Sequence, residues 1–350
     1  MPPDKTLFAN QVKEGQTVED IFLVKEMSRA ETRSGKPYLM LTLMDRSGEI
    51  AGRLWENAET FQDVCEPGNL VKIFGQAQAY KGILQVKIDS VLKLDKNEAD
   101  IGQFLLGSKR SIAAMAREIL TLAKSIHEPF CQKLALSFFL DKSFFLEFQQ
   151  APAAKSMHHA YLGGLLEHTL AVAKLANMLA GLYPDLDRDL LMTGALLHDI
   201  GKTRELAFSA FPFDYTDRGR LMGHLVIGVG MIQDKIHTLP DFPEDLATRL
   251  LHLILSHHGR YEFGSPSLPM MSEAFVLNFL DDLDAKLNFL GRLEEQATEP
   301  GYQWTDFQRT LERFLYVNGR PHAERENIDI HDQQNADDDS RLNSRQQHLF

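Results

Sequence analysis

The sequence predicts a multidomain protein: an all-β barrel comes first, an all-α helical bundle follows, and a disordered tail ends the chain. Three observations indicate this. Residues 15–95 contain short runs of alternating apolar and polar residues, residues 100–318 carry apolar residues at three- and four-residue spacing, and the remainder loses its apolar content. With 350 residues, of which 44% are hydrophobic, the chain is long enough to form two cores.

The N-terminal part has five strand-like runs: TVEDIFLVKEM, PYLMLTLMD, EIAGRLW, NLVKIFGQAQAY and ILQVKIDSVLKL. Turn signals such as Ser34-Gly35 and Pro67-Gly68 separate them. One helical stretch, ENAETFQDV, falls between the third and fourth runs. This order is that of the OB-fold, so residues 1–98 are expected to form such a barrel, and they resemble OB domains that bind single-stranded nucleic acid.

Aromatic and basic residues on the predicted strands are candidates for the nucleic-acid-binding face. Rings stack on bases and cations contact phosphates. The alternative is that the Tyr and Trp rings pack inside the barrel. The candidates are Tyr38, Arg53, Trp55, Tyr80 and Lys81.

Residues 99–155 are predicted to form a helical connector that packs on the domain that follows. Six phenylalanines in this segment are expected to form a helical core or to dock the barrel: Phe130, Phe138, Phe139, Phe144, Phe145 and Phe148. Residues 156–318 are predicted to form the helical bundle itself. The polar, Asp-rich residues 319–350 are predicted to be a disordered tail.

Imidazoles and carboxylates in the helical region form one candidate constellation. Such groups hold divalent transition metals, and a His-Asp pair allows two metal sites to share one carboxylate. The adjacent pairs His198-Asp199 and His257-His258 end two apolar runs, LLMTGALLHDIGK and DLATRLLHLILSHHG. Buried charge is costly there unless it is paired or metal-bound. Gly201 and Gly259 are the expected helix stops. The members are His168, His198, Asp199, His224, His257, His258 and Asp282.

This constellation resembles the defining residues of the HD-domain metal-dependent phosphohydrolases, through about residues 155–295. Four segments resemble more specifically the YhaM family of 3′-5′ exoribonucleases, in which an OB-fold precedes the HD domain. These segments are HHAYLGGLLEHT, ALLHDIGKTREL, SHHGRYEFGSP and LNFLDDLDAKL. The resemblance implies one metal on His168, His198, Asp199 and Asp282. It implies a second on Asp199, His224 and His257, and the choice between His257 and His258 stays open.

His-rich ligation favours Mn over Mg, with Fe, Co and Ni as alternatives. Asp199 and Lys202 are the candidate catalytic residues, because Lys202 lies one helical turn past Asp199 and is placed to meet a phosphate oxygen or the leaving group. His159, Arg204 and His258 are candidates for holding the scissile phosphate. For Arg204 the alternative is a surface ion pair with Glu205 or another neighbour.

The expected function is a metal-dependent 3′-5′ exonuclease that acts on single-stranded RNA, with single-stranded DNA as a further substrate, and releases nucleoside monophosphates. One alternative is an HD nucleotide phosphohydrolase with a regulatory OB domain. Another is a non-catalytic single-strand-binding replication accessory protein. RNA and the 3′-5′ polarity come from the resemblance alone.

Composition agrees in part with this function. The net charge of −12 is unfavourable for phosphate contacts, and metal ions would offset some of it. No apolar run reaches membrane-spanning length and no signal core begins the chain, so a cytoplasmic protein is expected. Cys65 and Cys131 are expected to be buried thiols.

The last five residues resemble the pentapeptide that binds the bacterial sliding clamp. Gln346, Leu349 and Phe350 occupy its informative positions. A disordered tail would present these two apolar side chains at its end. The alternative is that they dock onto the helical domain of their own chain.

Overall fold

The computed structural model describes residues 5–32, 34–80, 82–95, 101–105, 107–155, 159–208, 213–297 and 299–319. By contacts the chain divides into two compact units, Met1–Asp281 and Asp282–Phe350. The described part of the first unit contains a β-barrel and most of the helices, and that of the second contains the end of the last helix and a hairpin.

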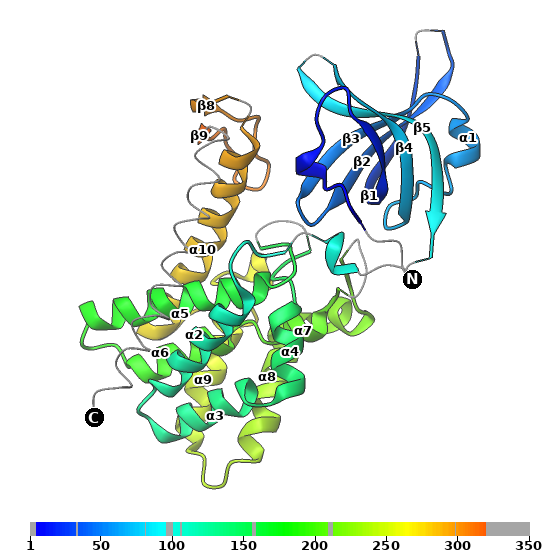
Figure 1. The fold of residues 1–350 in the computed structure, drawn as a ribbon. Coiled ribbons are helices and arrows are strands. Elements are labelled where there is room, and N and C mark those ends of the chain that lie inside the picture. The colour runs from blue at the N-terminus through cyan, green and yellow to red at the C-terminus, as the bar shows by residue number, and fades with distance from the viewer. Residues whose placement is uncertain are drawn as a thin grey trace, which may run out of the picture. The chain divides into compact units, whose positions relative to one another are not determined.

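Five strands close into a barrel in the order β1-β2-β3-β5-β4 (Figure 1). Strands β3 and β5 run parallel, and the other neighbours run antiparallel. A short helix, α1 (Ala58–Phe61), lies between β3 and β4 in the chain. This confirms the predicted OB-fold order. The strands are β1 (Thr17–Glu31), β2 (Pro37–Asp45), β3 (Gly48–Leu54), β4 (Leu70–Tyr80) and β5 (Ile83–Leu94).

Alternation along β2 separates the core of the barrel from its outer face. Leu39 and Leu41 are buried, whereas Tyr38 and Met40, which alternate with them, are partly exposed. Since successive side chains of a strand point to opposite faces, Tyr38 lies on the outer face. The alternative that Tyr38 packs inside the barrel is therefore wrong.

The predicted helical region is helical from residue 112 to residue 296, apart from its loops and two short strands, β6 (Leu206–Ala207) and β7 (Asp214–Tyr215). Polar side chains accept N–H groups at the first turns of several helices, among them Ser111, Asp187 and Thr216. The helices are α2 (Ile112–Lys124), α3 (Pro129–Phe139), α4 (Lys142–Gln150), α5 (Gly164–Leu182), α6 (Arg188–Leu197), α7 (Lys202–Glu205), α8 (Asp217–His237), α9 (Glu244–Ser256) and α10 (Ser272–Gln296).

One hydrophobic core joins the predicted connector to the helices that follow it. It runs from Met115 in α2 to Leu280 in α10. The six phenylalanines of the connector all belong to this core or pack against it, and several make edge-to-face ring contacts, such as Phe139 with Phe148. Their predicted role as a helical core is confirmed.

The second unit contains a two-stranded antiparallel hairpin that the helical expectation for residues 156–318 missed. Its strands are β8 (Gly301–Trp304) and β9 (Tyr316–Gly319). Tyr302 stacks on Tyr316 with ring centroids 5.2 Å apart. The cross-strand aromatic pair and Val317 are the β-forming signal that the helical interpretation overlooked.

Cys65 and Cys131 are buried free thiols, as expected, and burial raises their pKa values to about 11 and about 12. Among the described helices, none combines the length and apolar character that a membrane span needs. Residues 320–350, with the predicted tail and the clamp-like Gln346, Leu349 and Phe350, lie outside the described residues. Nothing in the structure supports the clamp hypothesis, which stays a prediction.

Candidate metal centre

Four of the predicted histidine ligands lie within or at the ends of four helices. His168 is buried in α5, His198 is the C-cap of α6, His224 lies in α8, and His257 is the C-cap of α9. Helix α9 ends as predicted, because Gly259 adopts a left-handed φ of +73°.

Gly201 acts differently from the predicted helix stop. Its φ is −62°, which any residue adopts. A Cβ atom at Gly201, however, would lie 2.1 Å from the carbonyl oxygen of His224. The glycine therefore allows the segment after His198-Asp199 to approach α8, and so brings His224 to the site.

Four residues converge in the first cluster: His168, His198, Asp199 and Asp281. The Nε2 atoms of His168 and His198 lie 3.1 Å apart. Asp281 Oδ1 lies 3.0 Å from His168 Nε2, and Asp199 Oδ2 lies 3.3 Å from His198 Nε2. All four side chains are buried or nearly so.

The structure corrects one member of the predicted set. Asp281, and not Asp282, supplies the carboxylate beside His168. Asp282 is exposed and forms an ion pair with Lys286, one helical turn further along α10. Helical periodicity explains the difference: Asp281 follows the buried Leu277 by four residues and shares its face, whereas Asp282 lies about 100° further around the helix.

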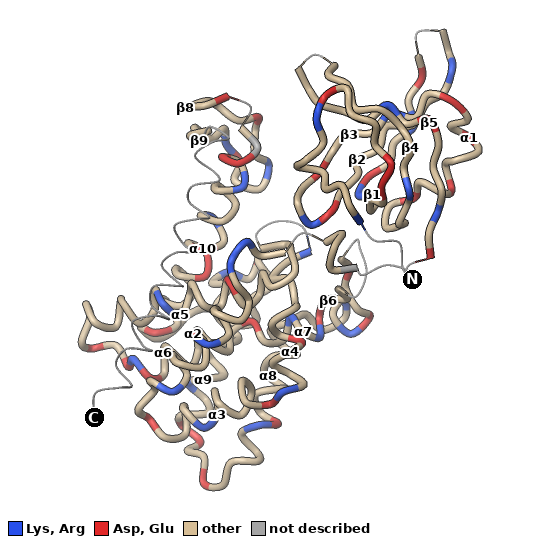
Figure 2. The backbone as a smooth tube through the Cα atoms, in the orientation of Figure 1, with Lys and Arg blue, Asp and Glu red and all other residues tan. Residues whose placement is uncertain are grey.

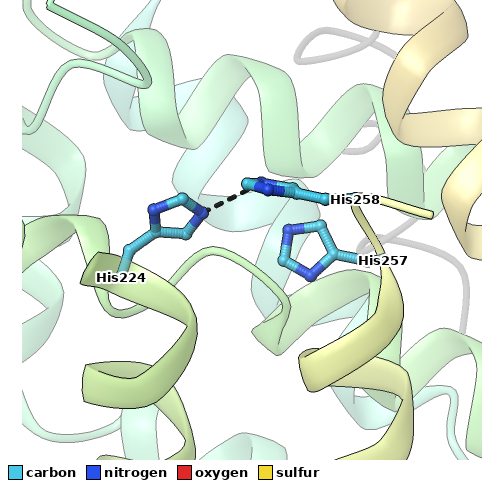
Figure 3. Close-up of side chains that lie close together, drawn as sticks. All are labelled: His224, His257 and His258. Carbon is cyan, nitrogen blue, oxygen red and sulfur yellow. Dashed lines mark hydrogen bonds between the residues drawn. The ribbon is translucent and has the colours of Figure 1, made fainter. Parts of the chain in front are cut away.

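The second cluster consists of His224, His257 and His258. Figure 3 shows His224 from α8 facing His258 beyond the end of α9, with His257 beside them. The Nε2 atoms of His224 and His258 are 3.1 Å apart. Both His257 and His258 thus lie within the cluster, and the choice between them stays open.

Asp199 lies between the two clusters and presents one oxygen to each. Its Oδ2 atom faces His198 and also lies 2.6 Å from Lys202 Nζ. Its Oδ1 atom lies 3.5 Å from His224 Nε2 and 3.6 Å from His257 Nε2. This is the arrangement that a carboxylate shared by two cations requires.

Hydrogen bonds at the other ring nitrogens orient the imidazoles. The Nδ1 atoms of His198, His257 and His258 lie 2.8 to 2.9 Å from backbone carbonyl oxygens, and the Nδ1 atom of His224 lies 2.9 Å from Glu205 Oε1. These acceptors place the proton of each neutral ring on Nδ1, so each Nε2 carries a lone pair. Two such lone pairs 3.1 Å apart repel unless a cation or a proton lies between them.

The charge state of the cluster suits a cation. Burial alone would raise the pKa of Asp199, but Lys202 and His198 outweigh it and hold that pKa well below its ordinary value. His168 likewise lowers the pKa of Asp281 against the effect of burial. Burial lowers the pKa of His257, and burial together with His257 and His224 lowers that of His258 to about 3. At neutral pH the two carboxylates are therefore ionised, and the imidazoles of His257 and His258 are neutral.

Within the described residues, Asp199 Oδ1 and His257 Nε2 are buried without a hydrogen-bond partner. A buried polar atom left unpaired costs about 1–3 kcal/mol. Borderline divalent metals take nitrogen and carboxylate donors of this kind, so the residues present fit the metals that the sequence implied.

The other predicted site residues of the helical domain are placed as follows. Lys202 is buried and its ammonium contacts Asp199. His159 is buried, with its Nδ1 atom 2.8 Å from the hydroxyl of Tyr161 and its ring 5.5 Å from that of His168. Arg204 is exposed and forms an ion pair with Glu147, so the alternative of a surface ion pair is the one observed.

On the barrel, the outer face brings together three of the five predicted residues. The rings of Tyr38 and Trp55 stack with centroids 4.3 Å apart and planes 22° apart. Arg53 lies two residues before Trp55 and helps to line an open groove of about 390 Å³. Tyr80 is exposed at the end of β4, and Lys81 lies outside the described residues.

Sequence reasoning missed Asp281 and Glu205. Glu205 is buried and accepts two hydrogen bonds from His224. It follows Lys202 by three residues, the spacing that places two side chains on one face of a helix, and this was the available signal.

Comparisons with known proteins give matches to both the barrel and the helical domain. A family model of the HD domain matches residues 165–286, and a model of an OB-fold nucleic acid binding domain matches residues 23–94. The chain is 35% identical over 288 residues to the 3′-5′ exoribonuclease YhaM of Geobacillus sp., covering 82% of this chain and 87% of that protein. It is 36% identical to YhaM of Bacillus subtilis, covering 82% and 90%. For YhaM of Halalkalibacterium halodurans the identity is 35%, with coverage of 82% and 88%.

Proposed function

Since this chain belongs to the YhaM family of 3′-5′ exoribonucleases, we propose that it removes nucleoside monophosphates from the 3′ end of single-stranded RNA by metal-dependent hydrolysis. One observation supports this chemistry most directly: among the described residues, Asp199 Oδ1 and His257 Nε2 are both buried and have no hydrogen-bond partner. Single-stranded DNA is a further substrate in this proposal.

Two divalent ions, with Mn preferred, belong to the proposal. His168, His198, Asp199 and Asp281 would hold one, and Asp199 would hold the other together with histidines of the second cluster. When bound, such ions supply a nucleophile from water near neutral pH and neutralise negative charge that develops on the phosphoryl oxygens.

The chain's own residues prepare the site for this chemistry. Lys202 keeps Asp199 ionised and fixes its orientation through the 2.6 Å contact with Oδ2. The remaining ammonium protons of Lys202 are donors for an oxygen of the scissile phosphate. The buried His159, beside His168, is proposed as a further contact to the substrate.

The roles of His258 and Arg204 change in this proposal. His258 lies within 3.1 Å of His224 Nε2, so we assign it to the second cluster as a ligand in addition to His257. Arg204 is neutralised by Glu147 and is assigned no contact with the substrate.

The barrel is proposed to capture the strand on its outer face. The stacked Tyr38 and Trp55 rings and the guanidinium of Arg53 offer a platform for bases and a cation for phosphate. Basic and acidic residues are interspersed over the described barrel and helices (Figure 2). Base stacking is therefore expected to contribute more to binding than a track of positive charge.

The proposal is tested by incubating Mn-loaded protein in parallel with end-labelled single-stranded RNA, single-stranded DNA and free nucleotides. We expect 5′-labelled RNA to shorten from its 3′ end in single-nucleotide steps, with nucleoside monophosphates as products. Hydrolysis of free nucleotides alone would replace the proposal with a nucleotide phosphohydrolase. Binding of RNA without cleavage would replace it with a single-strand-binding protein.

A further inference from the structure

Glu205, the last residue of α7, makes a two-point contact with a single histidine. Its Oε1 atom accepts the backbone N–H of His224 at 2.9 Å and lies 2.9 Å from the Nδ1 atom of the same residue. The side chain of Glu205 is 10% exposed. Burial alone would raise the pKa of Glu205, but the hydrogen bonds from His224 lower it, so the carboxylate is ionised at neutral pH.

A break in helix α8 makes this contact available. Gly223 has φ +70° and ψ 155°, which interrupts the helix immediately before His224. A helix start has N–H groups without partners inside the helix. Glu205 supplies the acceptor for the N–H of His224, and it does so with the same oxygen that receives the Nδ1–H group.

The backbone of Glu205 is held as firmly as its side chain. Its carbonyl oxygen accepts the N–H of Thr216 at 2.9 Å. A Cβ atom at Gly219 would lie 2.1 Å from the same carbonyl oxygen, so the start of α8 packs directly against Glu205. The carboxylate therefore reaches His224 from a fixed point.

The contact determines which nitrogen of His224 faces the cluster. With the proton on Nδ1, the lone pair lies on Nε2, which is 3.5 Å from Asp199 Oδ1 and 3.1 Å from His258 Nε2. The Nδ1 atoms of His198, His257 and His258 use backbone carbonyls of Ala195, Ile254 and Phe263 instead. Among these four histidines, His224 alone is oriented by a side chain, which a substitution can remove.

We propose that Glu205 is a positioning residue that fixes the tautomer and orientation of His224 as a ligand of the second metal site. This rests on the proposed function in one respect, namely that His224 binds a metal ion there. A carboxylate behind a ligating imidazole also makes the ligand more basic, and loss of such a partner lowers metal affinity by about 10–100-fold.

The test compares Glu205→Ala and Glu205→Gln with the unaltered protein by calorimetric titration of the metal-free proteins with Mn²⁺. We expect two ions for the unaltered protein and an affinity for the second ion that is about 10–100-fold weaker in Glu205→Ala. Glu205→Gln keeps an oxygen acceptor for both N–H groups, so a smaller loss is expected.

Glu273→Ala is the matched control, because Glu273 is also a buried carboxylate and accepts a backbone N–H, that of Asp187 at 2.8 Å, away from the cluster. It should bind both ions as the unaltered protein does. If circular dichroism shows that Glu205→Ala is unfolded, ¹⁵N NMR of the histidines in Glu205→Gln takes the place of the titration of Glu205→Ala. The spectrum should show His224 protonated on Nδ1.

Unchanged affinity for both ions in Glu205→Ala would overturn the positioning role and leave the proposed function intact. The positioning role would also be overturned if Glu205→Gln bound the second ion as weakly as Glu205→Ala does. The negative charge of Glu205, and not its hydrogen bonds to His224, would then account for the affinity. A His224 of Glu205→Gln protonated on Nε2 would also overturn the positioning role. An unaltered protein that binds no Mn²⁺ would remove both the positioning role and the proposed function.

Discussion

Asp199 Oδ1 and His257 Nε2 lie 3.6 Å apart in the interior of the helical domain, and among the described residues neither atom has a hydrogen-bond partner. Two unpaired acceptors this close destabilise the metal-free protein. A cation that both atoms bind would remove this destabilisation.

Mn²⁺ is expected to raise the thermal unfolding midpoint of chelator-treated protein. At a free concentration 100 times the dissociation constant, binding to the folded state stabilises it by about 2.7 kcal/mol. Mg²⁺ should give a smaller shift at equal concentration, because it prefers oxygen ligands. Differential scanning fluorimetry measures both. Equal shifts with the two ions would contradict the ligand argument.

Asp199→Asn should lose both metal ions while retaining the fold, because one carboxylate serves the two clusters. Hydrolysis should fall by about a thousandfold, since metal ions contribute several kcal/mol to stabilisation of the transition state. Elemental analysis of the purified variant measures the metal, and circular dichroism checks the fold. Two ions still bound would refute the shared carboxylate.

Asp281→Asn and Asp282→Asn form a matched pair of neighbouring substitutions. Asp281 lies 3.0 Å from His168 Nε2, whereas Asp282 is exposed and contacts Lys286. The first variant should lose one ion and most activity, and the second should keep both ions and full activity. The paired assay uses elemental analysis and cleavage of labelled RNA. A loss confined to Asp282→Asn would show that the sequence-based assignment was right.

Asp214 is expected to link stability to pH at the surface of the helical domain. Hydrogen bonds from Lys155 and Tyr215 N–H, together with Arg220, lower its pKa to about 2. A carboxyl group with a lowered pKa stabilises the fold above its ordinary pKa, and this contribution is lost as the pH falls towards 2. Asp214→Asn should therefore be less stable than the unaltered protein at pH 6 and should differ from it less at pH 3. Urea denaturation at the two pH values measures this, and equal differences would contradict it.

Periodicity was sufficient to predict the barrel and the helices, because alternation at period two and spacing of three to four residues are set by the buried faces themselves. The candidate ligands were singled out by residue type, by their place in the sequence and by the family resemblance. His198 and His257 could be recognised because each ends an apolar helix. Asp281 could not be separated from Asp282 by residue type. Only the register of α10 against the core, marked by Leu277, distinguishes the two.

Glu205 was not predicted, and Gly201 was predicted only as a helix stop, for a different reason. Their importance lies in contacts with His224, which is about twenty residues away in sequence and reaches them only through the packing of α8. The spacing of Glu205 from Lys202 indicates the helix face that Glu205 occupies, but it does not identify His224 as the partner. The hairpin of β8 and β9 did carry a signal, in Tyr302, Trp304 and Tyr316, but the helical pattern that precedes it was extended too far.

Trp55→Ala and Tyr38→Ala should weaken binding of long single-stranded RNA, each by about tenfold, because stacking on a base is worth about 1–3 kcal/mol. Hydrolysis of a dinucleotide should be unchanged, since the metal ligands lie in the helical domain. Trp304→Ala is the matched control, because Trp304 is 68% exposed on the hairpin of the second unit. Fluorescence anisotropy with labelled RNA gives the affinities. If Trp304→Ala weakens binding and Trp55→Ala does not, the outer face of the barrel is not where the strand binds.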